Sequence, residues 1–419
     1  MIPSRLKTGA LSDAPFRWFY LARTISLFGS GMTPVALAFA VLQAPQGQHL
    51  LGLVLGAELL PNVVMVLVGG SMADRYRRDR LIQLASLGSG VTQAAIAAVV
   101  LTGRSPYWIL PLAVVNGVVG AFTAPAIRGI VPEVVGKGDI REANALLNTS
   151  RSVAKVVGPA AAGILVASVG GGWGIAVDAL SFFGSALCMA RVRIPSHPAG
   201  PAGSVLRQMQ EGWAYFRRRR WIWSVTGAWT LMNFLQMGAW RVLGPILAAR
   251  SFGAAGWGLA LSFQAVGLLL ASLAMLRLTL TRPLLYGMAA AALLGIPMVV
   301  LGQGLPLPYL MAATVVAGIG STIASICWDT ALQQGVPKSK LSRVMAFDDF
   351  GSYAAIPLGV ILAVPAANHL GLHAVETGAG LIFIAVALLP LSLRLVRRMT
   401  AADIEAMGLE GEAAVPETD

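Results

Sequence analysis

Long apolar runs alternate with short polar connections along most of the chain. A helix needs about 20 apolar residues to cross the hydrocarbon core of a bilayer. The runs of about that length are residues 17–43, 50–73, 79–102, 106–130, 150–169, 172–191, 221–248, 254–276, 281–302, 306–331, 343–367 and 373–395. The pattern therefore predicts an all-α membrane protein with twelve transmembrane helices.

The connections between these runs differ in length and charge. Those after the odd-numbered spans are short, whereas those after the even-numbered spans are longer and basic, for example at 74–80 and 217–220. Lysine and arginine accumulate in cytoplasmic loops. We therefore expect the basic connections, and with an even number of spans both termini, to lie in the cytoplasm.

Composition supports a membrane protein. The 419 residues are 56% hydrophobic and only 12% charged, whereas a soluble domain is about 25% charged. The net charge of +12 sits in short clusters between apolar runs, so we expect no nucleic-acid partner. The two cysteines lie inside apolar runs and form no disulfide or metal motif.

The segment 192–220 is the longest hydrophilic stretch before the C-terminal tail. Proline and glycine open it as a linker, and four arginines, 217–220, end it. Apolar residues recur in between at helical spacing: Val205, Met209, Trp213 and Phe216. This pattern predicts an amphipathic helix on the inner leaflet; the alternative is a solvated basic linker.

The two halves of the chain resemble each other. VVNGVVGAFTAPAIRGIVP (114–132) has a counterpart in VVAGIGSTIASICWDTALQQGVP (315–337). Two six-span halves in parallel repeat are a known transporter plan. We predict an N-terminal six-helix bundle (1–191), the linker (192–220), a C-terminal six-helix bundle (221–398) and a disordered acidic tail (399–419).

Four motifs resemble the major facilitator superfamily, in particular its bacterial branch of enterobactin exporters and macrolide-efflux proteins. GGSMADRYRRDR (69–80) is similar to the loop signature G-x-L-A-D-R-x-G-R-R, and RSVAKVVGPAAAGIL looks like the antiporter motif G-x-x-x-G-P-x-x-G. SLFGSGMTPVALAFAVL and AVDALSFFGSAL look like the first and sixth spans of this branch. The resemblance implies a multi-pass protein of the bacterial inner membrane with two pseudo-symmetric six-helix bundles.

The resemblance also implies gating residues. They are Gly70, Asp74, Arg75, Arg78 and Arg80 in the loop signature, and Gly158, Pro159 and Gly163 in span five. Asp74 is expected to face the N-terminus of span eleven, while arginines bind carboxylates or helix C-termini as a latch. The alternatives are a positive-inside anchor for the loop and simple close packing for span five.

Ionisable residues inside spans are costly and commonly functional. The proton-coupling candidates are Glu58, Asp178 and Asp329. Glu58 lies about eight residues into span two, roughly 12 Å deep. Asp178 could instead form a structural hydrogen bond to a neighbouring span. Asp329 could instead pair with a loop arginine. Many relatives carry an arginine in span four and an acid in span one, where this chain has Asn116 and Ser30.

Polar and aromatic residues in the spans that line the cavity of this fold are candidates for substrate binding. They are Asn62, Asn116, Asn233, Gln236, Trp240, Arg241, Gln264 and Trp328. Amide and indole groups on an apolar wall suit a bulky lipophilic ligand. No Walker motif is present, so we expect an ion gradient to supply the energy and no cofactor to be needed.

These observations predict a monomeric secondary transporter that exports small lipophilic compounds, of the antibiotic or siderophore type, by proton antiport with alternating access. Its expected partners are that substrate, protons and the lipid bilayer. A lipid or lysophospholipid translocator, or an importer, is the alternative within the same fold. An intramembrane enzyme is disfavoured because no histidine lies in the interior of a span and no acids are suitably paired; a ligand-sensing receptor is a further alternative.

Overall fold

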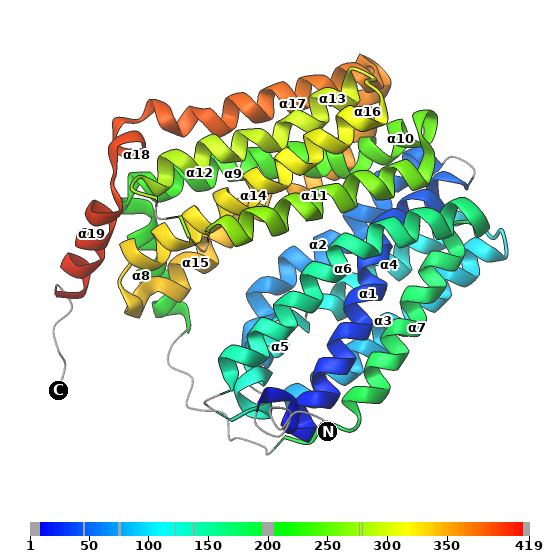
Figure 1. Ribbon diagram of the computed structural model, residues 1–419, viewed down its shortest axis with the longest axis horizontal. Coiled ribbons are helices and arrows are strands. Elements are labelled where there is room, and N and C mark those ends of the chain that lie inside the picture. The colour runs from blue at the N-terminus through cyan, green and yellow to red at the C-terminus, as the bar shows by residue number, and fades with distance from the viewer. Residues whose placement is uncertain are drawn as a thin grey trace. The chain divides into compact units, whose positions relative to one another are not determined.

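The computed structural model describes residues 9–44, 47–73, 77–121, 123–136, 139–194, 205–275, 277–278 and 280–413. Only the backbone is described at 62–73, 124–125, 128–129, 132, 141, 205–211, 338–339, 342, 408 and 410–413. Regular structure in these ranges is helical throughout, as predicted (Figure 1).

The helices coincide with the twelve predicted spans. Within the described ranges, nine helices are long and apolar enough to cross a membrane. The other three predicted spans correspond to α2 (Gly47–Ala73), to η3 with α4 and α5 (106–134), and to α9 with η4 and α10 (220–251). The predicted boundaries differ from the observed ones mainly where a helix continues beyond its apolar run, as at 140–149 and 338–342.

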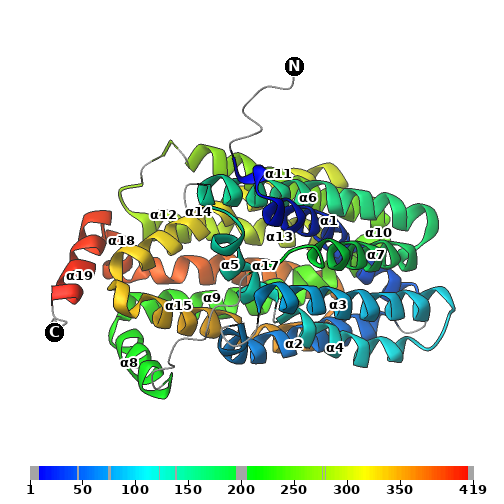
Figure 2. The same cartoon turned by 90° about the horizontal axis from the view of Figure 1, so that it is seen from below.

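The chain forms two compact units. The N-terminal unit comprises Met1–Gly200 together with Ala248–Ser262. Its complete helices are η2 (Ala10–Ser12), α1 (Ala14–Leu42), α2, α3 (Arg78–Leu101), η3 (Pro106–Trp108), α4 (Ile109–Ala121), α5 (Thr123–Val134), α6 (Ile140–Val169) and α7 (Gly171–Met189). Helix α1 packs against α6 and α7, α3 against α7 and α4, and α2 against α4 (Figures 1 and 2).

The C-terminal unit comprises Pro201–Leu247 and Phe263–Asp419. Its helices are α8 (Val205–Arg218), α9 (Arg220–Gly238), the π-helix η4 (Ala239–Leu243), α12 (Pro283–Ala292), η5 (Leu293–Gly295), α13 (Ile296–Gly302), α14 (Leu307–Gly335), α15 (Lys338–Tyr353), α16 (Ile356–Leu370), α17 (Leu372–Leu388), η6 (Leu389–Ser392), α18 (Arg394–Arg398) and α19 (Ala401–Ala413). Helices α10 (Gly244–Ser251) and α11 (Gly253–Met275) have residues in both units.

Glycines repeat at equivalent places in the two halves. Gly170, with φ 92°, separates α6 from α7, and Gly371, with φ 89°, separates α16 from α17. Such positive φ values favour glycine because other residues carry a Cβ that clashes. Gly103 and Gly304, also at positive φ, are separated by the same number of residues as Gly170 and Gly371. The shared spacing supports the parallel repeat read from the sequence.

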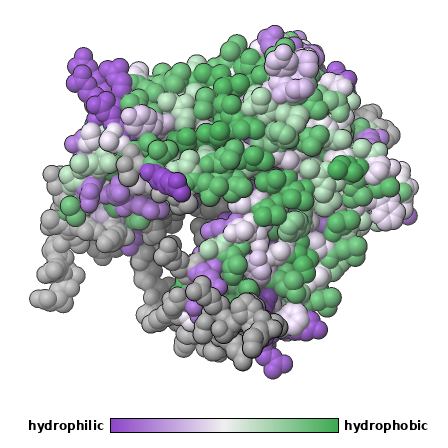
Figure 3. Space-filling model, in the orientation of Figure 1, coloured by the Kyte–Doolittle hydropathy of each residue, from purple (hydrophilic) through white to green (hydrophobic). Residues whose placement is uncertain are grey.

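The surface of each unit is apolar along the flanks of its helices. Figure 3 shows hydrophobic residues over these flanks and hydrophilic residues near the helix ends. Exposed apolar side chains include Leu84 and Leu187 in the N-terminal unit and Leu273 and Leu381 in the C-terminal unit. A surface of this kind fits the hydrocarbon of a bilayer, because lipid tails do not penalise exposed leucine.

Helix α8 has the amphipathic pattern expected of the linker, and its aromatic face has a protein partner. The rings of Trp213 and Phe216 lie 5.4 and 6.4 Å from the ring of Phe347 on α15. The Tyr215 hydroxyl donates a hydrogen bond to the Gly335 carbonyl at 3.3 Å, and burial raises the pKa of this phenol. Helix α8 therefore belongs to the C-terminal unit. Its expected position on the inner leaflet stays a prediction.

The C-terminal tail differs from the expected disorder. Residues 401–413 form α19, and the fully buried side chain of Ile404 lies near Gly335 on α14. The helix begins with a capping box: the Thr400 backbone N–H donates to Asp403 Oδ2 at 2.9 Å, and the Asp403 N–H donates to Thr400 Oγ1 at 3.2 Å. Local capping outweighs the acidic composition here.

Replacing Thr400 with alanine is expected to fray the start of α19. Loss of a threonine cap should speed amide exchange over 401–406 by roughly fivefold. The Thr400 N–H and hydroxyl lower the pKa of Asp403. The cap should therefore be intact above the ordinary aspartate pKa of about 3.9 and weaken as pH falls through the lower folded value. Hydrogen-exchange mass spectrometry measures both effects; equal exchange in wild type and variant would contradict the cap.

Candidate functional site

A buried polar network joins three helices of the N-terminal unit around Glu58. The Asn116 side-chain amide on α4 donates a hydrogen bond to Glu58 Oε1 on α2 at 3.1 Å. The Asn116 carbonyl oxygen in turn accepts a hydrogen bond from the Thr92 hydroxyl on α3 at 3.1 Å. Two residues predicted to serve different purposes, proton coupling for Glu58 and substrate binding for Asn116, thus lie in direct contact.

Asp178 on α7 accepts a second set of hydrogen bonds in the same unit. The Asp178 residue is only 1% exposed. Thr33 on α1 donates a hydrogen bond to Asp178 Oδ2 at 2.7 Å, and Ser181 donates to Oδ1 at 3.4 Å. Ser30, which stands where many relatives carry an acid, also hydrogen-bonds to Asp178, and Glu58 interacts with it electrostatically. The hydrogen bond from Thr33 on α1 fits the structural alternative for Asp178, while its proton-coupling role stays a prediction.

Small residues bring these helices close enough for the polar side chains to meet. A Cβ on Gly117 of α4 would collide with the backbone carbonyl of Glu58. A Cβ on Gly29 of α1 would lie 2.7 Å from Asp178 Oδ1 and closer still to Ser181. Glycine at these positions lets the helix backbones approach. The spacing of glycine and polar residues on α1 and α4 thus places the network inside the bundle.

A second polar group lies in the C-terminal unit. Asp348 on α15 accepts hydrogen bonds from the Thr226 hydroxyl at 2.5 Å and from the Trp328 indole at 2.8 Å. Asp329 and Asp349 interact with it electrostatically. Trp328 was predicted to bind substrate, and its indole N–H is already hydrogen-bonded to Asp348. Asp329, which is exposed on α14, has a neighbouring acid in Asp349.

The remaining predicted substrate residues are spread over several elements. The Asn233 amide on α9 donates to the Ser352 carbonyl at 3.1 Å. Trp240 is buried in η4, where Arg241 is exposed. Gln236 and Gln264 are half-buried on α9 and α11. Asn62 lies on α2, where only the backbone is described.

The gating residues of the loop signature are described only in part. Asp74 and Arg75 lie outside the described residues, and Gly70 lies on α2 where the backbone alone is described. Arg78, at the start of α3, donates a hydrogen bond to Glu133 on α5 at 2.5 Å and forms an ion pair with it. Arg78 therefore binds a carboxylate within the N-terminal unit, and its role in gating stays a prediction.

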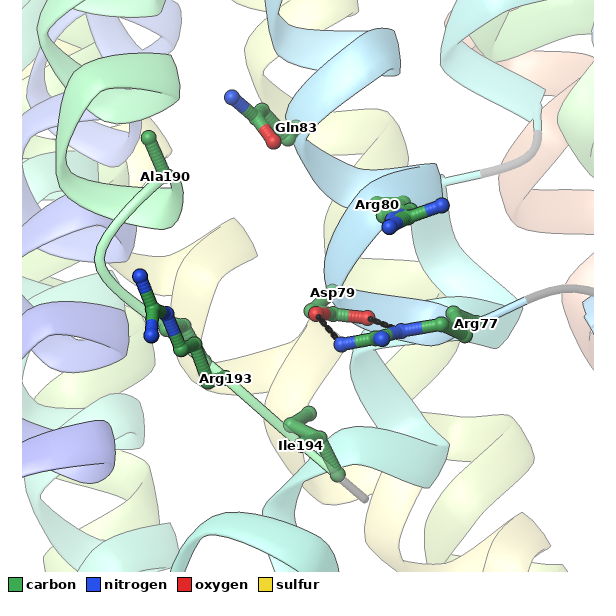
Figure 4. Close-up of a pocket in the computed structure, with 8 residues that line it drawn as sticks. Arg77, Asp79, Arg80, Gln83, Ala190, Arg193 and Ile194 are labelled. Carbon is green, nitrogen blue, oxygen red and sulfur yellow. Dashed lines mark hydrogen bonds and ion pairs between the residues drawn. The ribbon is translucent and has the colours of Figure 1, made fainter. Parts of the chain in front are cut away.

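Arg80 lies beside a pocket of about 510 Å³ at the beginning of α3 (Figure 4). Figure 4 shows Asp79 held by Arg77 through two hydrogen bonds, of 3.2 and 2.8 Å. Arg193 comes from the segment that follows α7. The pocket is lined by Arg77, Asp79, Arg80, Gln83, Ala190, Val192, Arg193 and Ile194. Its three arginines exceed its single acid, so the pocket is basic.

The contact between Arg78 and Glu133 is expected to couple α3 to α5. A double-mutant cycle of Arg78→Ala and Glu133→Ala should give a coupling energy of about 1 kcal/mol, because both side chains are partly buried. The coupling should shrink as salt is added. Chemical denaturation in detergent measures it, and Arg80→Ala with Glu133→Ala serves as the matched cycle, for which additivity is expected. Additive effects in the first cycle as well would contradict the contact.

The span-five motif forms a close helix seam inside the N-terminal unit. A Cβ on Gly158 of α6 would lie 2.7 Å from the carbonyl carbon of Gly31 on α1. A Cβ on Gly163 would lie 2.7 Å from the Ala254 carbonyl oxygen, and a Cβ on Gly258 would collide with the Pro159 carbonyl. Helix α6 thus approaches α1 closely on one side and the start of α11 on the other. This is the close packing named as the alternative for span five, and the gating role of Gly158, Pro159 and Gly163 stays a prediction.

One buried acid was missed by sequence reasoning. Glu376 on α17 is 0% exposed, and neither carboxylate oxygen has a hydrogen-bond partner among the described residues. The signal was available, because Glu376 is the acid in the last predicted span, 373–395. Thr33 and Thr92 were missed as well; each follows a glycine by four residues or fewer on its helix, which marks the close packing that brings their hydroxyls into the network.

Comparison with known proteins assigns the chain to a family. Residues 8–415 match the family described as transmembrane secretion effector. The multidrug efflux pump Tap of Mycobacterium tuberculosis is 27% identical over 402 residues, covering 91% of this chain and 94% of that protein. Macrolide efflux protein A of Streptococcus pyogenes is 22% identical over 397 residues, covering 92% and 97%.

Solved structures support the same fold. The nucleoside transporter NupG superposes with a TM-score of 0.74 at 12% identity, covering 90% of this chain and 98% of that one. A bacterial homologue of the human lysosomal transporter Spinster, in an inward-facing and unoccupied conformation, gives 0.63 at 14% identity and covers 95% and 97%. The helices, the repeat and the family match agree: this chain belongs to the transmembrane secretion effector family of major facilitator superfamily transporters.

Proposed function

We propose that this protein exports small lipophilic compounds, of the antibiotic or siderophore type, across the bacterial cytoplasmic membrane in exchange for protons. In this proposal it works as a monomer with both termini in the cytoplasm. The family is one of transporters, and relatives over nearly the full length are named for multidrug and macrolide efflux. Amide and indole groups in the spans suit a lipophilic ligand with few hydrogen bonds.

The carboxyl pair of the N-terminal unit carries the proposal for protons. Glu58 and Asp178 come from different helices and interact electrostatically, and each carboxyl group accepts a hydrogen bond from a neighbouring helix, Glu58 from Asn116 and Asp178 from Thr33. Because the two carboxyl groups interact, the charge of one disfavours the charge of the other and so favours its protonation. An exporter that exchanges substrate for a proton needs such a site, whose proton occupancy changes between its two conformations.

The experiment uses purified protein in liposomes that contain a pH-sensitive dye. A proton gradient is imposed, and macrolides, other lipophilic antibiotics and a siderophore are added one at a time. We expect at least one compound to accumulate against its own gradient while protons move the opposite way. A protonophore should abolish the accumulation, because it removes the driving gradient.

Three outcomes would contradict the proposal in different ways. Compound movement that ignores the proton gradient would indicate uniport. Movement of a fluorescent lysophospholipid, with no response to the other compounds, would indicate lipid translocation. Absence of any movement, in protein shown to be folded by its thermal unfolding transition, would indicate a role other than transport.

A further inference from the structure

Glu376 is a buried acid that has no role in the proposed proton exchange. It lies in the first third of α17, and the residue is 0% exposed. Neither oxygen of its carboxyl group has a hydrogen-bond partner among the described residues. Most buried polar groups in proteins are hydrogen-bonded, so an acid in this position is an exception that needs a physical explanation.

The neighbours of α17 do not bring a compensating charge to this acid. Helices α9, α12, α13 and α16, together with η4, η5 and η6, pack against α17. The titratable groups on all these elements are Arg220, Arg241, Tyr286, His369 and, on α17 itself, His373. The first four are exposed, and the Gly302 carbonyl accepts a hydrogen bond from His373 Nδ1 at 2.9 Å.

The position of Glu376 on α17 explains this isolation. Thr377 packs against Gly302, and Gly380 packs against Gly295 and Val299, so this side of the helix is occupied by α13 and η5. Glu376 is in line with Phe383, seven residues further on, which is also 0% exposed. The carboxyl group therefore lies on the apolar, inward side of the helix.

An unpaired carboxylate ion is very costly in such a place, whereas the neutral acid costs far less. The packing described here therefore requires a proton on Glu376. Loss of that proton would require the carboxylate to reach water or a cation, which means that the contacts of α17 must open. Proton binding and the packing of α17 are thus linked.

The π-helix η4 supplies the place where this packing can change. It interrupts the helix between α9 and α10, and it packs against both α16 and α17. π-turns within helices occur frequently at functional sites, and discontinuous helices form the substrate and ion sites of many transporters. A change in this turn would alter the surroundings of α17.

We propose that Glu376 is a proton-binding site of the C-terminal unit, occupied in the packing described here and emptied when the contacts of α17 with α9 and η4 open. The step is the simple loss of a proton from the carboxylic acid to water, which leaves the carboxylate. The inference rests on the proposed proton-coupled function and deepens it, because it adds a second site to that of Glu58 and Asp178.

The test is made on the full-length protein without substrate, by infrared spectroscopy over a series of pH values. We expect wild type near neutral pH to show a carboxylic acid C=O band that Glu376→Gln lacks. Raising the pH should remove this band. Identical wild-type and Glu376→Gln spectra in the carboxylic acid region would overturn the proposal.

Amide exchange over 372–388 provides the second measurement, normalised at each pH to unstructured peptide. Wild type should lose protection of α17 as pH rises, because the ionised acid cannot stay buried, whereas Glu376→Gln and Glu376→Leu should keep it. Equal protection in all three proteins at every pH would overturn the link to packing. If Glu376→Gln does not fold, Glu376→Leu, which fills the same apolar site, replaces it in both measurements.

The two measurements are independent of transport. A wild-type protein that moves no protons with any compound would contradict the proposed function, while the Glu376 band and its pH dependence would still stand. Conversely, proton-coupled transport with no Glu376 band would leave the proposed function intact and remove this second site.

Discussion

Replacing Glu58 with glutamine is expected to remove substrate-driven proton movement. Glutamine keeps an oxygen that can accept the hydrogen bond from the Asn116 amide, so the network should keep its geometry. It cannot bind and release a proton at physiological pH. We expect the coupled proton flux in liposomes to fall by at least about tenfold, equivalent to about 1.4 kcal/mol, while the protein still binds its compound.

The control for this prediction is Glu405→Gln on α19, where the same change is made at an exposed acid; it should leave the flux unchanged. Asp178→Asn should share the defect, because Asp178 interacts with Glu58. Unchanged flux in Glu58→Gln together with loss of flux in Asp178→Asn would indicate that Asp178 alone carries the proton. Unchanged flux in both variants would rule out the carboxyl pair as the coupling site.

Replacing Gly158 with alanine is expected to destabilise the protein strongly for a single added methyl group. The new Cβ would lie 2.7 Å from the carbonyl carbon of Gly31, and a backbone atom cannot rotate away as a flexible side chain can. Overpacking of this kind costs about 1–3 kcal/mol. The thermal unfolding temperature in detergent should fall, and transport should fall with it because α1 and α6 are forced apart.

Gly120→Ala on α4 is the matched control. A Cβ there would meet no atom within 4 Å, so the better helix propensity of alanine should dominate and stabilise the protein by about 0.5–1 kcal/mol. The two substitutions are chemically identical and should have opposite signs. A Gly158→Ala variant as stable as Gly120→Ala would show that the seam between α6 and α1 can open without cost.

Much of the fold could be predicted from the sequence because a bilayer imposes a simple length rule. Each run of about 20 apolar residues corresponds to a helix or to a short series of helices, and the matching motifs led to the correct family. Boundaries were less accurate. Helix α6 begins at Ile140, ten residues before the predicted span, since a helix can continue in polar sequence once its apolar part is packed.

The candidate site could be predicted only as a set of residue types. Glu58, Asn116 and Asp178 were recognised because polar groups inside apolar runs are rare. The contacts of Asn116 with Glu58 and Thr92, and of Asp178 with Thr33, depend on how the helices rotate about their axes. Periodicity does not determine that rotation when a helix is apolar on all sides, as in a membrane bundle.

The sequence by itself thus determined the helical class, the number of spans, the repeat and the family. It did so because apolar length, glycine position and motif spacing are local properties of the chain. Only the tertiary structure decided which polar side chains meet and which remain alone. It joined Glu58 to Asn116 and left Glu376 without a hydrogen-bond partner among the described residues. The physical reason is that pairing depends on distances between helices far apart in the chain, and packing sets those distances.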